Sequence, residues 1–297
     1  MKLKEIARKV LEECQVLDKR TPADQLPAPE PGVANRQAQG PKLIAIHGIQ
    51  QRSGTVFLGE LIRLHPQVEA FPKDIWEAPL LPNIHHIEHF ENDFFQQYEQ
   101  NRDKLPKHFF SQLMGRAFLE QIQETPGKTI LLKVPSVQHL QYFPVMFPGQ
   151  KLVIIIRDGR DNVASTIKTW PDTPFQAACE RWNQSAREIL AFREAYGDQS
   201  FYTLVRFEDL LDQQEITLKS LLERLELPRS EYPFNSTDEI EVIGSSDTAD
   251  QGTPNWDGVK KPANFSPTKR WADWSSEQLD QFNTIAGESM RALGYTD

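Results

Sequence analysis

The sequence predicts a three-layer α/β/α fold with a central, mainly parallel β-sheet. Short apolar segments alternate with longer amphipathic segments along the chain, and one of them, KLVIIIRD, has an unbroken Val/Ile core. An unbroken apolar segment is typical of a strand that is buried on both faces, as strands of parallel sheets are. Strands that alternate with helices indicate a parallel sheet covered by helical layers.

The first expected unit is a strand, a loop and a helix. KLIAIHG is an apolar strand that ends at Gly48, and SGTVFLGELIRLHP follows with helical spacing until Pro66 stops it. Further strands are expected at Thr129 to Val134, 151–158 and from Phe201 onwards. The predicted helices that separate or follow them are Phe94 to Gln123, Val137 to Met146, Asn162 to Trp170, Phe175 to Tyr196, Ile216 to Leu225 and Ser276 to Leu293.

The chain of 297 residues is expected to hold one catalytic domain at 41–297. Residues 1–40 are expected to form an N-terminal helix, with apolar positions at Ile6, Val10 and Leu11, and then a Pro-rich arm or linker. No internal repeat is evident.

Composition limits the partners and the compartment. A formal net charge of -9 gives no global electrostatic support for binding nucleic acid or an anionic membrane, so any anion site must be built locally. The two cysteines, Cys14 and Cys179, suggest no disulfide framework. The N-terminus has no apolar signal core and no stretch is apolar enough to span a bilayer, so we expect a cytoplasmic protein.

The loop GIQQRSGT, from Gly48 to Thr55, lies between the first strand and the first helix. Backbone N–H groups and the helix dipole converge on an anion at such a position, and Arg52 adds a positive charge. The loop is no Walker A motif, because Gly54 is followed by Thr55 and not by lysine. An ordinary glycine turn with a solvated arginine is the alternative.

A second anion site is predicted in LVIIIRDGRDNVAS. Arg157 falls at the end of the buried strand, and parallel sheets bind ligands at that edge. If the chain turns at Asp158 and Gly159 and then enters a helix, Ser165 faces the same space, and a guanidinium and a hydroxyl recognise a phosphate together. A salt bridge from Arg157 to Asp158 or Asp161 is the alternative.

Together these segments resemble the PAPS-dependent sulfotransferases, which transfer a sulfonate from 3′-phosphoadenosine 5′-phosphosulfate (PAPS) and have a fold similar to that of P-loop NTPases. The 5′-phosphosulfate loop of that family reads like RSGT, and its 3′-phosphate segment reads like RDxRDxxxS. LKVP at Lys133 resembles the catalytic lysine segment, VRFEDL resembles RYEDL, and the segment from Asn264 to Tyr295 resembles the C-terminal end of bacterial members.

The resemblance implies residue roles one by one. Phe57 replaces an aromatic residue that stacks on adenine, and Lys133 with Arg52 stabilises charge on the reacting oxygens. Donor-binding residues are Gly48, Arg52, Ser53, Gly54 and Thr55 at the 5′-phosphosulfate, Arg157 and Ser165 at the 3′-phosphate, and Lys269 and Arg270 in a segment that folds over the donor. Solvated loop charges are the alternative for Lys269 and Arg270.

The sequence lacks the general base that one branch of the family uses. Small-molecule sulfotransferases carry a histidine two residues after the lysine, but Pro135 stands there. Heparan sulfate and tyrosylprotein sulfotransferases use a glutamate in the segment after the first helix. The matching segment here is HPQVEAFPKDIWEAP, which offers Asp74 by closest register and Glu77 as the alternative.

The predicted reaction is in-line sulfonate transfer from PAPS to a hydroxyl or amine of an unidentified acceptor, with a carboxylate as general base and PAP, the desulfonated nucleotide, as product. The acceptor could be a small molecule, a sugar, a lipid or a peptide. No metal is expected. His85, His86 and His89 lie close together, but they lack the HExxH order and an obvious further ligand.

Two other functions fit part of the pattern. A P-loop-like small-molecule kinase predicts Mg²⁺-dependent ATP binding, and the missing lysine after Gly54 argues against it. A non-catalytic nucleotide-binding homologue keeps the fold without the chemistry.

Overall fold

The computed structural model describes residues 40–245, 256–262 and 265–296. In these ranges five strands form one sheet in the order β2-β3-β1-β4-β5, and every neighbouring pair is parallel. The strands are β1 (Lys42–Gly48), β2 (Val68–Ala70), β3 (Thr129–Val134), β4 (Lys151–Ile156) and β5 (Tyr202–Arg206). The predicted α/β fold class is confirmed, with the apolar β4 buried from Leu152 to Ile156.

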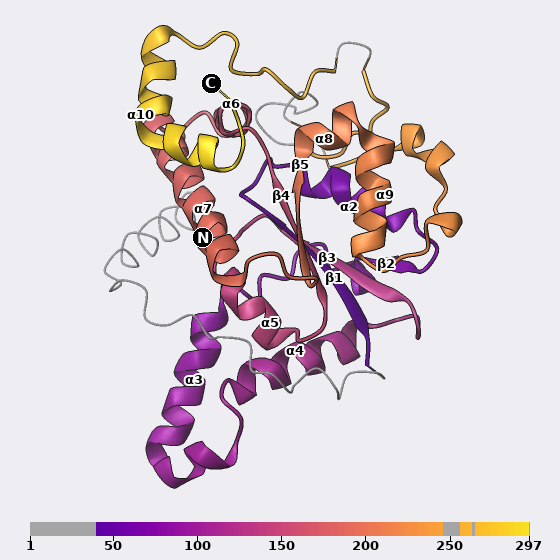
Figure 1. Cartoon of the computed structure of the whole chain (residues 1–297), viewed down its shortest axis with the longest axis vertical. Helices are drawn as coiled ribbons and strands as arrows, with labels where there is room; N and C mark the ends of the chain where they lie inside the picture. Colours follow the sequence, from indigo (N-terminus) through magenta and orange to yellow (C-terminus); the bar gives the residue numbers. More distant parts are fainter. Residues whose placement is uncertain (1–39, 246–255, 263–264, 297) are drawn as a thin grey trace.

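Helices cover both faces of the sheet and make it the middle layer (Figure 1). On one face, α7 (Phe175–Tyr196) and α10 (Ser276–Ala292) pack around Trp182 and Phe282, which are fully buried. On the other face, α2 (Thr55–Arg63) and α9 (Gln214–Arg224) contribute Leu58 and Leu222 to a second apolar core.

The segment 84–122 differs from the prediction. We expected one helix from Phe94 to Gln123, but the chain forms α3 (Ile84–Gln97), a short η3 (Glu99–Lys104) and α4 (Phe109–Ile122). Pro106 lies between η3 and α4, and a proline inside a helix removes a hydrogen bond and clashes with the preceding turn. The single-helix prediction was therefore wrong.

Other elements are shorter than expected or new. The predicted helix from Val137 to Met146 is reduced to η4 (Leu140–Tyr142) and α5 (Phe143–Met146). The short edge strand β2 and the helix α8 (Phe207–Asp212) were not predicted. The remaining short elements are η2 (Pro72–Asp74), η5 (Arg229–Glu231) and η6 (Phe234–Glu239). The expected N-terminal helix and arm, together with Cys14, lie outside the described residues.

The parallel sheet brings the ends of distant strands to one edge. β1 ends at Gly48, β3 at Val134, β4 at Ile156 and β5 at Arg206, and parallel pairing puts these four ends side by side. Open parallel sheets bind ligands outside this edge. Among the described helices, none combines the length and apolar character needed to cross a membrane.

Candidate active site

The loop from Gly48 to Thr55 is tightly folded between β1 and α2. Arg52 and Gly54 both have positive φ angles, 69° and 93°, so the chain turns sharply just before the helix. A Cβ atom on Gly48 would collide with Ser53 Oγ and lie 2.6 Å from Thr55 Cγ2, so only glycine fits there. The Ser53 side chain is fully buried and its Oγ has no hydrogen-bond partner in the described structure. The loop thus presents an unsatisfied hydroxyl at the N-terminus of a helix, as an anion site does.

Arg157 follows β4 and is almost completely buried. Its Nη1 donates to the carbonyl oxygen of Arg52 over 2.6 Å, its Nη2 donates to the carbonyl oxygen of Pro267, and its guanidinium lies 4.9 Å from the centre of the Phe207 ring. Burial, with help from the positive charge of Arg270, lowers the pKa of Arg157 to about 10, so it remains protonated at neutral pH. Its Nε has no partner among the described residues.

The acidic neighbours of Arg157 have other partners. Asp158 forms an ion pair with Arg160, with 2.7 Å between Oδ2 and Nη2, and Asp161 accepts hydrogen bonds from backbone N–H groups. The predicted alternative of a structural salt bridge from Arg157 to either carboxylate is therefore absent from the described contacts. A buried guanidinium without a carboxylate partner is a group that an anionic ligand would satisfy.

Two arginines contact Ser165, which lies about one and a half turns into α6 (Gly159–Thr169). Arg52 Nε and Arg270 Nη1 each lie 3.4 Å from Ser165 Oγ, and the positive charge of Arg270 also acts on Arg157. Like charges repel, so such a cluster is stabilised when an anion lies among them. The predicted turn and helix therefore do bring Arg157 and Ser165 to the same place.

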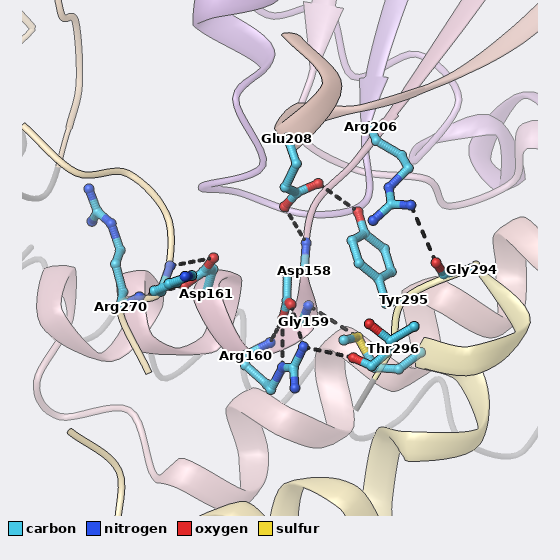
Figure 2. A network of polar contacts seen from close by, with 12 residues as sticks. Asp158, Gly159, Arg160, Asp161, Arg206, Glu208, Arg270, Gly294, Tyr295 and Thr296 are labelled. Carbon is cyan, nitrogen blue, oxygen red and sulfur yellow. Dashed lines mark hydrogen bonds and ion pairs between the residues drawn. The ribbon is translucent and has the colours of Figure 1, made fainter. Parts of the chain in front are cut away.

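Asp161 holds the C-terminal segment against α6. Its carboxylate accepts hydrogen bonds from the backbone N–H of Lys269, over 3.0 Å, and of Arg270, over 2.6 Å (Figure 2). Burial raises the pKa of Asp161, and the Arg157 charge and the two backbone hydrogen bonds oppose that shift. The side chain of Arg270 consequently lies by Ser165, while Lys269 is exposed and contributes its backbone.

A polar network fixes the turn between β4 and α6. Glu208 accepts a hydrogen bond from the backbone N–H of Asp158 over 2.9 Å and another from the hydroxyl of Tyr295 over 3.1 Å (Figure 2). Arg160, already paired with Asp158, also donates to the carbonyl oxygen of Thr296 over 3.0 Å. The chain end therefore supports the segment that carries Arg157 and Ser165.

One cavity of about 280 Å³ connects these groups. Its wall includes many of the residues predicted from sequence: Arg52, Gly54, Thr55, Phe57, Glu77, Lys133, Arg157, Ser165 and Arg270. Gly48, Ser53, Lys269 and Asp74 are not part of that wall. The structure thus brings both predicted anion sites and Lys133 to a common space.

Lys133 and Glu77 meet on the cavity wall. Lys133 lies near the end of β3, its side chain is buried, and its Nζ lies 2.9 Å from Glu77 Oε1. A β-bridge between the two residues holds their backbones together, and the Trp76 ring lies 5.8 Å from the lysine Nζ. Asp74 is exposed at the end of η2. Of the two carboxylates that the sequence offered as the base, the geometry favours Glu77 over Asp74.

Sequence reasoning missed several residues on the wall. Phe207 packs under Arg157 and edge-on to Phe57, with 6.2 Å between the two ring centres. Gly244 accepts a hydrogen bond from Arg52 Nη1 over 2.6 Å. Phe207 could have been found, because it directly follows β5 at the edge where ligands bind. Gly244 lies in a segment with no motif, and only the tertiary fold brings it to the site.

The histidine cluster is on α3, and the rings of His85 and His86 lie 3.9 Å apart. No group of three or more His, Cys, Asp or Glu side chains in the described ranges is arranged to hold a metal ion. Cys179 is free and fully buried in the core.

The fold and site define an open α/β protein with arginine and hydroxyl side chains gathered around a cavity at the carboxyl edge of a parallel sheet. The family model described as "Sulfotransferase family" matches residues 44–231, and the chain belongs to that family. Among curated relatives, protein-tyrosine sulfotransferase A of Caenorhabditis elegans is 24% identical over 82% of this chain, and protein-tyrosine sulfotransferase 1 of Danio rerio is 22% identical over 85%. The chain spans 65% and 72% of their respective lengths.

Solved structures show the same fold. The sulfotransferase domain of the Synechococcus PCC 7002 olefin synthase has a TM-score of 0.55 and 20% identity, with 92% of this chain and 100% of that chain covered. The sulfotransferase domain from the curacin biosynthetic pathway has a TM-score of 0.51 and 16% identity, with 87% and 99% covered. Retinol dehydratase, solved with androsterone and the inactive cofactor PAP, has a TM-score of 0.50 and 14% identity, with 87% and 83% covered.

Proposed function

We propose that this protein transfers a sulfonate group from PAPS to a hydroxyl or amine of an acceptor. The observation that carries the proposal is that two anion-binding groups, the Gly48–Thr55 loop and the Arg157/Ser165 pair, meet at one cavity. PAPS has an anionic group on each side of one adenosine, and a nucleotide without a 3′-phosphate leaves the second group unused.

The unsatisfied polar atoms fit such a donor. Ser53 Oγ and Arg157 Nε are buried and lack partners in the described structure. Buried donors without partners are costly, and phosphate or sulfonate oxygens would satisfy both. Arg52, Ser53, Gly54 and Thr55 would hold the 5′-phosphosulfate, Arg157, Ser165 and Arg270 would hold the 3′-phosphate, and Phe57 would contact the adenine. The assignments of Gly48, as a loop residue, and of Lys269, through its backbone, remain proposals of the same kind.

The reaction is a direct displacement at sulfur. The acceptor oxygen or nitrogen forms a bond to sulfur, the bond between sulfur and the bridging phosphate oxygen breaks, and PAP leaves with the electron pair. Lys133 and Arg52 stabilise the negative charge on the bridging and sulfonate oxygens, and Glu77 takes the acceptor proton. In the ligand-free structure Lys133 forms an ion pair with Glu77, so a donor that draws the ammonium away would leave the carboxylate able to accept that proton.

The names of the curated relatives suggest a class of acceptor. The curated relatives are named for protein tyrosine, so a tyrosine hydroxyl in a peptide is the first acceptor to test. Sugar, lipid and small-molecule hydroxyls remain alternatives. The cytoplasmic location and the division of the chain at residue 40 stay predictions from sequence.

A thermal-shift panel tests the donor. The full chain is heated with PAP, with AMP and with ATP plus Mg²⁺. We expect PAP to raise the unfolding temperature well above the other two, because only PAP satisfies both anion sites. Stabilisation by ATP with Mg²⁺ alone would instead support the alternative function of a small-molecule kinase. The absence of a lysine after Gly54 disfavours that alternative.

A further inference from the structure

Glu60 is a buried carboxylate on the wall of the cavity, and the mechanism above does not use it. It lies on α2, and its Oε2 forms an ion pair with Arg63 Nε over 2.8 Å. Its other oxygen, Oε1, is buried and has no hydrogen-bond partner among the described residues. Burial raises the pKa of Glu60, and the charge of Arg63 opposes that shift.

The position of Glu60 on α2 separates it from the Gly48–Thr55 loop. It lies five residues beyond Thr55, about 7.5 Å along the axis of α2 from the phosphate-binding loop. Phe57 lies one turn before Glu60 on the same face of α2. Leu211 and Ile240 line the same cavity. Phe57 and Glu60 thus place an aromatic ring and a buried acceptor oxygen one turn apart on α2, in a cavity that also has apolar residues on its wall.

A flat, apolar ring with an N–H group on its edge fits these features. An acceptor that is buried without a donor destabilises the protein, and a ligand N–H that reaches it removes that cost. The 6-amino group of adenine is such a donor. A purine with an oxygen at the same place, as in hypoxanthine, would point an acceptor at a carboxylate oxygen and be repelled.

We propose that Glu60 Oε1 accepts a hydrogen bond from the 6-amino group of the donor adenine, so that Glu60 selects adenine over 6-oxo purines. The inference rests on the proposed function, because it assigns the base end of the nucleotide whose phosphates bind at the loop and at Arg157. It makes Glu60 a specificity-determining residue for the donor.

Calorimetric titration of the full chain tests this selectivity with three ligands: PAP, its inosine analogue 3′-phosphoinosine 5′-phosphate, and AMP. The wild-type protein is expected to bind PAP about 10- to 100-fold more tightly than the inosine analogue. In Glu60→Gln the amide can donate as well as accept, so this ratio should fall to about 3 or less. The matched control Arg63→Gln removes the ion pair but keeps the carboxylate, and its ratio should stay near that of the wild type.

The outcomes separate this inference from the proposed function. If wild-type protein binds PAP and the inosine analogue equally, or if Glu60→Gln keeps the full ratio, the role of Glu60 is disproved. In that case tighter binding of PAP than of AMP would still support the two phosphate sites. No binding of PAP would overturn both proposals. Equal binding by the wild type would disprove the role of Glu60 whether or not Glu60→Gln folds.

Discussion

The ammonium of Lys133 lies 2.9 Å from the carboxylate of Glu77, at the wall of the cavity that also holds Arg52 and Arg157. The lysine comes from near the end of β3 and the glutamate from the segment that follows η2, and a β-bridge fixes both backbones. The pair places an ammonium and a carboxylate side by side on the wall of the cavity that Arg52, Gly54 and Thr55 also line. Such an arrangement serves a reaction in which negative charge develops on one oxygen while another loses its proton.

Glu77→Gln should lower kcat about 10²- to 10³-fold and leave the affinity for PAP nearly unchanged, because the amide cannot take the acceptor proton. Asp74→Asn is the matched control and should keep turnover close to that of the wild type, since Asp74 is exposed away from the cavity wall. Steady-state kinetics with PAPS measures both. Near-normal turnover in Glu77→Gln together with a large loss in Asp74→Asn would reverse the assignment.

Arg157→Ala should abolish the preference for PAP over AMP. The change removes a buried cation from the proposed 3′-phosphate site. The affinity for PAP should therefore fall about 100-fold, while the affinity for AMP should change much less. Titration calorimetry with the two nucleotides gives the ratio. Lys168→Gln, a change of an exposed cation on the same helix α6, should leave it unaltered. An unchanged ratio in Arg157→Ala contradicts the proposed site.

Asp161→Asn should lower the affinity for PAP about 10-fold, because it loosens the segment that carries Arg270. The backbone N–H groups of Lys269 and Arg270 donate to different oxygens of the carboxylate. An asparagine keeps only one acceptor oxygen and turns an NH₂ group towards the other N–H, so one of the two hydrogen bonds is lost. If Asp161 acts through Arg270, then Arg270→Ala should cause little further loss of PAP affinity when Asp161→Asn is already present. A double-mutant cycle of PAP affinities measures that coupling. Asp273→Asn, an exposed change on the same segment, serves as control. Additive losses would mean that Asp161 does not position Arg270.

The stability of the protein should depend on the protonation of His47. Its Nδ1 lies 2.7 Å from the carbonyl oxygen of Ser136, and burial lowers its pKa from 6.5 to about 4. Between these values the unfolded chain binds a proton that the folded chain does not, so the free energy of unfolding falls as the pH drops below 6.5. At about pH 5 this contribution amounts to about 2 kcal/mol.

Chemical denaturation at about pH 7.5 and pH 5 checks this prediction. Between about pH 7.5 and pH 5, the free energy of unfolding of His47→Gln should fall by about 2 kcal/mol less than that of the wild type. His89→Gln, which changes an exposed histidine of α3, should lose as much as the wild type. An equal loss in His47→Gln and wild type would contradict a neutral, buried His47.

Many residues on the cavity wall at the two proposed phosphate sites could be predicted from sequence, because their determinants are local. Gly48 and Gly54 shape one loop, and Arg157 and Ser165 are joined by one strand end and one helix turn. The residues that complete the wall, such as Gly244 and Pro267, come from segments that carry no periodic pattern. Their positions depend on long-range contacts, including the hold of Asp161 on the C-terminal segment.

The choice between Asp74 and Glu77 could not be made from spacing. The η2 turn that ends at Asp74 has positive φ angles at Lys73 and Asp74. The chain therefore changes direction there, and counting residues from the first helix does not show which carboxylate reaches Lys133. The break between α3 and α4 was available from sequence, because Pro106 stands inside the predicted helix. The apolar residues on both sides of the proline have helical spacing, so that pattern alone predicted one continuous helix.

Transfer of radiolabelled sulfonate from PAPS tests the central claim most directly. Wild-type protein and Lys133→Ala are incubated with labelled PAPS and a panel of tyrosine peptides, sugars, lipids and small alcohols. We predict label on at least one acceptor with the wild type and a loss of about 10²-fold or more with Lys133→Ala. Binding of PAP without transfer to any acceptor would contradict the claim and indicate a nucleotide-binding protein that lacks the chemistry.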